Sequence, residues 1–128
     1  MVRTVKSQRP VNLDITTIKF TPQMIASITH RIAGVAIFFG MAFLIWGLGL
    51  SLESQESFDQ LKECMDGVIV KLIVWAILAG FIYHFVAGVR HLLMDAGYFE
   101  TLEGSKALSI AVLILSAVLI AVAGVWVW

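Results

Sequence analysis

The sequence predicts an all-α membrane protein with three transmembrane helices. Hydrophobic residues make up 59% of the 128 residues and charged residues only 14%, whereas a soluble domain carries about 25% charge. The charges fall in blocks that leave 32–52, 72–89 and 107–128 without formal charge. Each of these stretches has about 20 residues, enough for a helix to cross the ~30 Å hydrocarbon layer. The sequence lacks the ~10-residue alternating strands of a barrel, which leaves helices as the spanning structure.

The composition also excludes several classes of protein. Nine basic and nine acidic residues give zero net charge, so the chain has no basic footprint for nucleic acid. A disordered chain would be polar and poor in apolar groups. The single cysteine, Cys64, cannot form an internal disulfide or hold zinc or an iron–sulfur cluster alone.

The first helix is expected over residues 22–50, after an N-terminal segment at 1–21. Thr21 and Pro22 are typical of a helix start, because the threonine hydroxyl caps the helix and proline lacks an amide there. The helix is longer than one membrane crossing requires. Its first two turns, which hold Ser27, His30 and Arg31, are therefore expected at the membrane interface.

The second and third helices are expected over residues 67–94 and 106–128. An acidic loop at 51–66 separates the first two helices, and a shorter loop at 95–105 separates the last two. Asp95 and Gly97 close the second helix, since glycine is favoured just past a helix end.

Lys and Arg residues predict the orientation in the membrane. Those on the N-terminal side of the first helix are Arg3, Lys6, Arg9, Lys19 and Arg31. The 51–66 loop carries instead Glu53, Glu56, Asp59, Glu63 and Asp66. By the positive-inside rule, the N-terminus and the 95–105 loop face the cytoplasm, and the acidic loop and the C-terminus face the other side.

His84 is the most informative position for function. It lies ten residues before Met94, or roughly 15 Å from the cytoplasmic end of its helix, where an ionisable side chain indicates a function. Gly80 and Gly88 flank it at i−4 and i+4, which leaves room for a haem ligated by the imidazole. The same glycines are also typical of helix packing, with His84 bonded to a neighbouring helix, and a proton relay is a third reading. His91 lies on nearly the same face, so a second axial ligand must come from another chain.

Ser27 and Arg31 form a second constellation, because residues at i and i+4 share a helix face. A hydroxyl beside a fixed cation suits a carbonyl that becomes anionic on reduction, such as that of a quinone. The cation also suits haem propionates. A simpler reading is an arginine that extends to the lipid headgroups from the end of a helix.

Two motifs resemble signatures of one known family. Residues 27–34, S-I-T-H-R-I-A-G, resemble the S-x-x-H-R-x-[ST]-G signature of the cytochrome b556 membrane-anchor subunits of succinate dehydrogenase. Residues 84–95 resemble the second signature, H-x3-G-x-R-H-x3-D. Residues 9–14, R-P-V-N-L-D, are similar to the N-terminal segment of the enterobacterial type. Ala33 departs from the family, which usually has a hydroxyl there.

This resemblance implies one of two anchors of a respiratory complex in the bacterial inner membrane. The chain would pack with a second three-helix anchor subunit and hold an iron–sulfur subunit and a flavoprotein subunit on the cytoplasmic face. His84 would ligate the iron of haem b, with the other ligand from the companion anchor. Ser27 and Arg31 would bind ubiquinone, and His30, Arg31 and His91 would contact the haem propionates. Succinate oxidation would occur in another subunit.

Two other functions remain open at this point. A fumarate reductase anchor would share this layout, and a haem spectrum would distinguish it from the anchors that lack haem. A small scaffold or transporter would have no pigment, and transporters of this size usually carry a carboxylate within a span. Menaquinone is an alternative to ubiquinone.

Overall fold

The computed structural model describes residues 14–128, and the regular structure within them is entirely helical. In chain order the elements are the short 3-10 helix η1 (Ile15–Thr17), α1 (Pro22–Glu53), α2 (Gln55–Met65), α3 (Val68–Asp95) and α4 (Leu102–Val127). Among the described residues, α1, α3 and α4 are long and apolar enough to cross a membrane. The predicted all-α fold with three spanning helices is confirmed. Arg3, Lys6 and Arg9, and the motif residues before Asp14, lie outside the described part.

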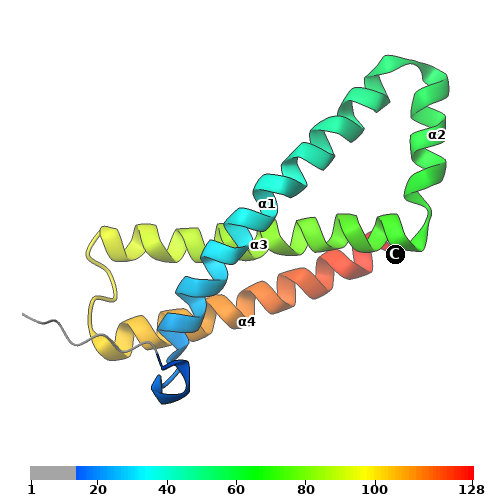
Figure 1. Cartoon of the computed structure of the whole chain (residues 1–128). Coiled ribbons are helices and arrows are strands. Elements are labelled where there is room, and N and C mark those ends of the chain that lie inside the picture. The colour runs from blue at the N-terminus through cyan, green and yellow to red at the C-terminus, as the bar shows by residue number, and fades with distance from the viewer. Residues whose placement is uncertain (1–13) are drawn as a thin grey trace, which may run out of the picture.

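The helices form a pair and a crossing helix (Figure 1). α3 and α4 run antiparallel side by side, whereas α1 crosses α3 and then diverges from it. The indole N–H of Trp75 on α3 donates to the carbonyl oxygen of Ile120 on α4 at 3.0 Å. α2 connects the far end of α1 with the beginning of α3. The α1–α3 crossing therefore brings together the two helices that carry the sequence motifs.

α1 begins where the sequence predicts. The hydroxyl oxygen of Thr21 accepts a hydrogen bond from the Met24 amide at 3.3 Å, and Pro22 occupies the first helical position. The helix continues past the expected end at Leu50 to Glu53. Its 32 residues exceed the ~20 that a bilayer crossing needs. The turns that carry the S-x-x-H-R motif lie at its N-terminal end and are part of this additional length.

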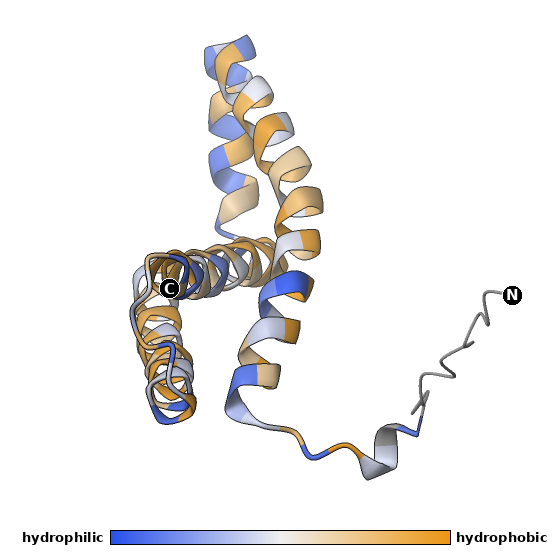
Figure 2. Cartoon of the chain, turned by 90° about the vertical axis from the view of Figure 1, so that its left-hand side faces the viewer, coloured by the Kyte–Doolittle hydropathy of each residue, from blue (hydrophilic) through white to orange (hydrophobic). Residues whose placement is uncertain are grey.

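The segment expected as an acidic loop, 51–66, contains the eleven-residue helix α2. Ser54 caps it by accepting a hydrogen bond from the Ser57 amide at 3.1 Å, which is a typical N-cap. Glu56 lies in its first turn and Lys62 in its last turn, where each side chain interacts favourably with the helix dipole. Figure 2 shows hydrophilic and hydrophobic residues alternating along this helix. Its apolar residues Phe58, Leu61 and Met65 line a pocket together with residues of α1 and of the beginning of α3.

α4 begins at Leu102 rather than at Lys106, because Thr101 caps it. The threonine hydroxyl accepts from the Gly104 amide at 3.0 Å. The expected boundary followed the last charge before the apolar run, whereas the capping residue determines where the helix starts. Between α3 and α4, Gly97 has a φ of 85°, a conformation that glycine adopts at helix ends without steric cost.

The buried residues are small, as in other membrane helix interfaces. Apart from one arginine, the fully or nearly fully buried side chains are Ala26, Ala33, Ala87, Ser109, Val112 and Ser116. The large apolar side chains of the spanning helices are mostly exposed. In a bilayer, such surfaces contact lipid or other subunits.

Candidate functional site

The crossing of α1 and α3 brings three histidines together. The ring of His30 on α1 stacks on that of His84 on α3, with centroids 4.0 Å apart and planes 18° apart. His91, also on α3, lies with its ring centroid 5.1 Å from that of His30. The sequence places His84 and His91 on one helix face, but it does not show that His30 packs against both.

One hydrogen bond sets the tautomer of the neutral His84 ring. Its Nδ1 lies 3.1 Å from the backbone carbonyl oxygen of His30. A carbonyl oxygen only accepts, so Nδ1 must carry the proton. The lone pair of the neutral ring is then on Nε2, which is hydrogen-bonded to no residue in the described part of the chain. This is the usual arrangement of a histidine that ligates a metal, whose second nitrogen donates to a carbonyl or carboxylate.

The two glycines that flank His84 face α1. A Cβ added at Gly88 would lie 3.9 Å from Nε2 of His30, and one added at Gly80 would lie 3.6 Å from Cγ1 of Ile37. Both distances are ordinary van der Waals contacts. The helix-packing reading of these glycines therefore has direct contacts in its support, whereas their role as space for a haem stays a prediction.

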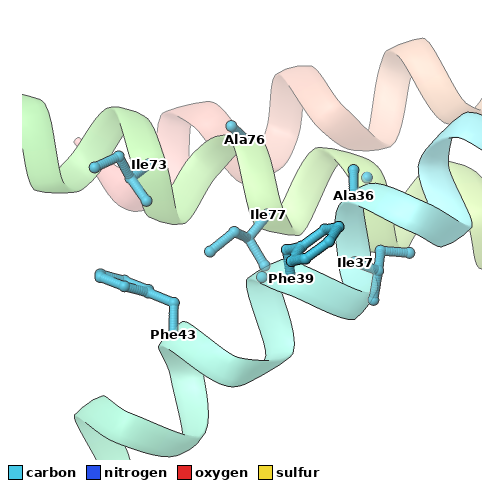
Figure 3. A pocket seen from close by; sticks show the side chains of 9 residues that line it. Ala36, Ile37, Phe39, Phe43, Ile73, Ala76 and Ile77 are labelled. Atoms are coloured by element: carbon cyan, nitrogen blue, oxygen red, sulfur yellow. The ribbon is translucent and has the colours of Figure 1, made fainter.

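An apolar pocket of about 410 Å³ lies between α1 and α3, beginning at Gly80, one turn before His84. Figure 3 shows Phe39 and Phe43 of α1 opposite Ile73 and Ile77 of α3. No charged or hydrogen-bonding side chain lines it. A planar apolar group next to His84 would contact the apolar side chains that line this pocket.

Ser27 and Arg31 lie on the outer part of α1, with Ser27 half-buried and Arg31 exposed. Within residues 14–128, neither side chain has a hydrogen bond or an ion pair. Their donors are therefore available to a ligand or to another chain.

Tyr83, which the sequence reading did not select, anchors this part of α1 to α3. Its hydroxyl forms a short hydrogen bond with the hydroxyl of Thr29 and also donates to the carbonyl oxygen of Ala26 at 3.1 Å. The bonded turn contains Ser27 and precedes Arg31, and Tyr83 is adjacent to His84. The sequence shows only that a tyrosine precedes His84. Which residues the Tyr83 hydroxyl contacts depends on how α1 and α3 cross.

Three buried polar side-chain atoms have no hydrogen-bond partner in the described part of the chain: Nε2 of His30, Nε of Arg90 and the hydroxyl oxygen of Ser116. Arg90 is only 5% exposed, and its Nη2 donates to the Ser105 hydroxyl of α4 at 3.3 Å. Burying a donor without a partner costs about 1–3 kcal/mol. The side chains of His30 and Arg90 therefore suit a partner from outside this chain, such as a carboxylate.

The described residues hold no group of three or more histidine, cysteine, aspartate or glutamate side chains arranged for a metal ion. A free metal ion usually needs such a set. A haem iron needs only one axial ligand from this chain, because the porphyrin supplies four nitrogen ligands. His84 suits a haem iron, because its Nδ1 is hydrogen-bonded and its Nε2 is bonded to no residue in the described part of the chain.

Comparison with known proteins gives consistent matches. Residues 5–123 match the protein family described as succinate dehydrogenase/fumarate reductase transmembrane subunit. The succinate dehydrogenase cytochrome b556 subunit of Coxiella burnetii is 38% identical over 125 residues, covering 97% of this chain and 100% of that protein. The subunit of the same name from Paracoccus denitrificans is 32% identical over 118 residues, covering 89% of this chain and 88% of that one. The Rickettsia conorii protein of that name is 35% identical over 94 residues, or 73% of each chain.

Proposed function

The chain belongs to the family of succinate dehydrogenase/fumarate reductase transmembrane subunits, and we propose that it is the cytochrome b anchor of a succinate:ubiquinone oxidoreductase. The relatives that match it along most of their length carry the name of that cytochrome subunit. The observation that carries the proposal is the hydrogen bond between Nδ1 of His84 and the carbonyl oxygen of His30. It leaves Nε2 of a membrane-embedded histidine as a free ligand.

His84 would hold the iron of haem b through Nε2, and a companion anchor subunit would supply the other protein ligand. When bound, the haem supplies a one-electron redox centre. His30 and Arg31 would bind its propionates, with His91 as a further contact. The buried Nε2 of His30, which lacks an acceptor in the described chain, supports this assignment. The remaining large apolar surface of α1, α3 and α4 suits lipid and the companion subunit.

Ser27 and Arg31 would bind the quinone at the start of α1. The hydroxyl and the guanidinium share a helix face, and neither is bonded to a residue in 14–128. As the quinone gains electrons, its carbonyl oxygens become more negative. A fixed cation and a hydroxyl donor would stabilise that charge, which is the electrostatic contribution expected of such a site.

The chain would contribute no group to succinate oxidation. We assign that reaction to the flavoprotein subunit, from which an iron–sulfur subunit would carry electrons to the quinone. We place both on the cytoplasmic side of the bacterial inner membrane, where the positive-inside rule also puts the S-x-x-H-R motif. The chain itself would supply the membrane anchor, the haem ligand and part of the quinone pocket.

The absorption spectrum of the purified complex tests the ligand assignment. His84→Leu should remove the low-spin b-type haem spectrum, because leucine cannot coordinate iron. His91→Leu is the comparison variant: it removes a proposed propionate contact from the same face of α3 but no iron ligand, so the low-spin spectrum should remain. An unchanged spectrum in His84→Leu would refute the assignment. A wild-type complex that contains all its subunits but no haem would refute the proposed function as a whole.

A further inference from the structure

We propose that Gly34 and the backbone carbonyl of His30 act together as positioning groups for the His84 imidazole. The carbonyl fixes which ring nitrogen carries the proton, and Gly34 provides the space that lets the ring reach that carbonyl. The inference rests on the proposed role of His84 as the haem ligand. It assigns a function to the final glycine of the 27–34 motif, which the interpretation of the motif left without one.

The carbonyl of His30 can accept two hydrogen bonds. Within α1 the carbonyl of residue 30 faces the amide of residue 34, in the usual i to i+4 pattern of an α-helix. A carbonyl oxygen has two lone pairs. The second accepts from Nδ1 of His84 at 3.1 Å. A side chain can reach that oxygen only if residue 34, one turn further along, does not block the approach.

Gly34 lies against the edge of the His84 ring formed by Nδ1 and Cε1. A Cβ placed there would be 3.0 Å from Cε1 of His84 and 3.4 Å from Nδ1. Carbon atoms in good contact are about 3.5–4.0 Å apart. Any larger residue at position 34 would therefore push the ring away from the carbonyl. The displaced atoms are Nδ1, which makes the hydrogen bond, and its ring neighbour Cε1.

The same arrangement, a ring N–H bonded to a helix carbonyl with a glycine one turn beyond it, occurs a second time in the described residues. The indole N–H of Trp75, on the same helix as His84, donates to the carbonyl oxygen of Ile120 at 3.0 Å. The residue one turn beyond Ile120 is again a glycine, and a Cβ at Gly124 would lie 3.1 Å from Nε1 of Trp75. An indole nitrogen only donates. The parallel supports the assignment of the His84 proton to Nδ1, because both rings make the same approach to a helix carbonyl.

The hydrogen bond between His84 and the His30 carbonyl would affect the haem through the iron-ligating imidazole. A ligand imidazole that donates its other N–H to a carbonyl is held in one orientation and is a stronger electron donor to the metal. Loss of the bond would weaken haem binding and favour the ferrous state, which raises the midpoint potential. Loss of such partners typically weakens metal binding by about 10–100-fold.

The test compares three glycine variants of the assembled complex. In Gly34→Ala we expect an altered low-spin EPR spectrum, a higher midpoint potential, and haem loss to a scavenging apoprotein that is faster by about tenfold or more. Gly124→Ala is the matched control, because it introduces an equally close Cβ beside a ring of α3 away from His84. Gly47→Ala adds a Cβ that meets nothing within 4 Å. Both controls should keep the wild-type potential and haem spectrum.

The outcomes separate the inference from the proposed function. If His84→Leu loses the low-spin haem but Gly34→Ala matches the controls, the inference fails and the proposed function stands. If Gly34→Ala and Gly124→Ala change the haem equally, general packing is the cause and the inference also fails. If Gly34→Ala does not assemble, pulsed EPR of the wild-type ferric complex decides. It should detect a hydrogen-bonded proton on Nδ1 of the ligand, and a deprotonated nitrogen or a free N–H would overturn the inference.

Discussion

Arg31 presents the simplest test of a single residue, because its side chain is exposed and has no partner within residues 14–128. We predict that Arg31→Ala slows succinate:quinone turnover by about tenfold or more, since loss of a donor to a developing anion often costs 100-fold in a buried site. Succinate oxidation with a soluble dye should change little. The two assays on the same preparation provide the comparison.

Lys19→Ala is the control for the loss of one positive charge. It is another exposed cation on the N-terminal side of the membrane, before α1 begins at Pro22. Lys19→Ala should leave both rates near the wild-type values, and Arg31→Lys should restore part of the quinone rate. Equal losses of the quinone and dye rates in Arg31→Ala would contradict a role in quinone binding.

At this scale the sequence proposes candidate residues, but it does not show which side chains they contact. His84 stands out because a histidine deep in a span is costly, and its depth follows from counting along one helix. Gly34 and Tyr83 act through contacts with the other helix, which a single helix face does not show. The close stacking of His30 on His84 is likewise a property of the crossing.

At the scale of elements, α1 and α3 are joined by few polar contacts, and Tyr83 makes two of them. We predict that Tyr83→Phe lowers the stability of the membrane domain by about 1 kcal/mol, a typical value for a lost hydrogen bond. It should also raise the KM for quinone more than it lowers kcat, because the turn that carries Ser27 and Arg31 loses its link to α3. Thermal denaturation and quinone titration of the same complex measure the two effects.

Tyr98 provides a matched tyrosine in the loop between α3 and α4. It is exposed, and its hydroxyl has no hydrogen bond within the described residues. Tyr98→Phe should therefore leave the melting temperature and the KM unchanged. A Tyr83→Phe complex with an unchanged KM for quinone would show that the link stabilises the helices without positioning the site.

The helix boundaries show what charge patterning predicts and what it misses. The apolar stretches locate all three spans, since a bilayer imposes a minimum length. The ends depend instead on capping residues: Thr21 followed by proline predicts the start of α1, whereas Ser54 and Thr101 cap helices whose starts charge patterning does not predict. α2 was missed because its residues are polar enough for a loop. Its helix depends on a serine cap and on apolar residues that line a pocket with α1 and α3.

At the scale of the whole molecule, the orientation in the membrane is a prediction that the positive-inside rule makes and that the helix arrangement alone does not test. The acidic segment with α2 is expected on the periplasmic side and the 96–101 loop on the cytoplasmic side. The two lie at opposite ends of α3. A probe that cannot cross the membrane distinguishes these ends.

Cys64 makes the experiment possible without a new label site. It is the one cysteine of the sequence, and on α2 it is exposed. We predict that a membrane-impermeant maleimide labels this chain in intact spheroplasts. In a Cys64→Ser background, Tyr98→Cys should be labelled only after the membrane is inverted, because its loop would face the cytoplasm. The reverse pattern would place the Ser27 and Arg31 end of α1 on the periplasmic side, away from any cytoplasmic iron–sulfur subunit, and would contradict the proposed assembly.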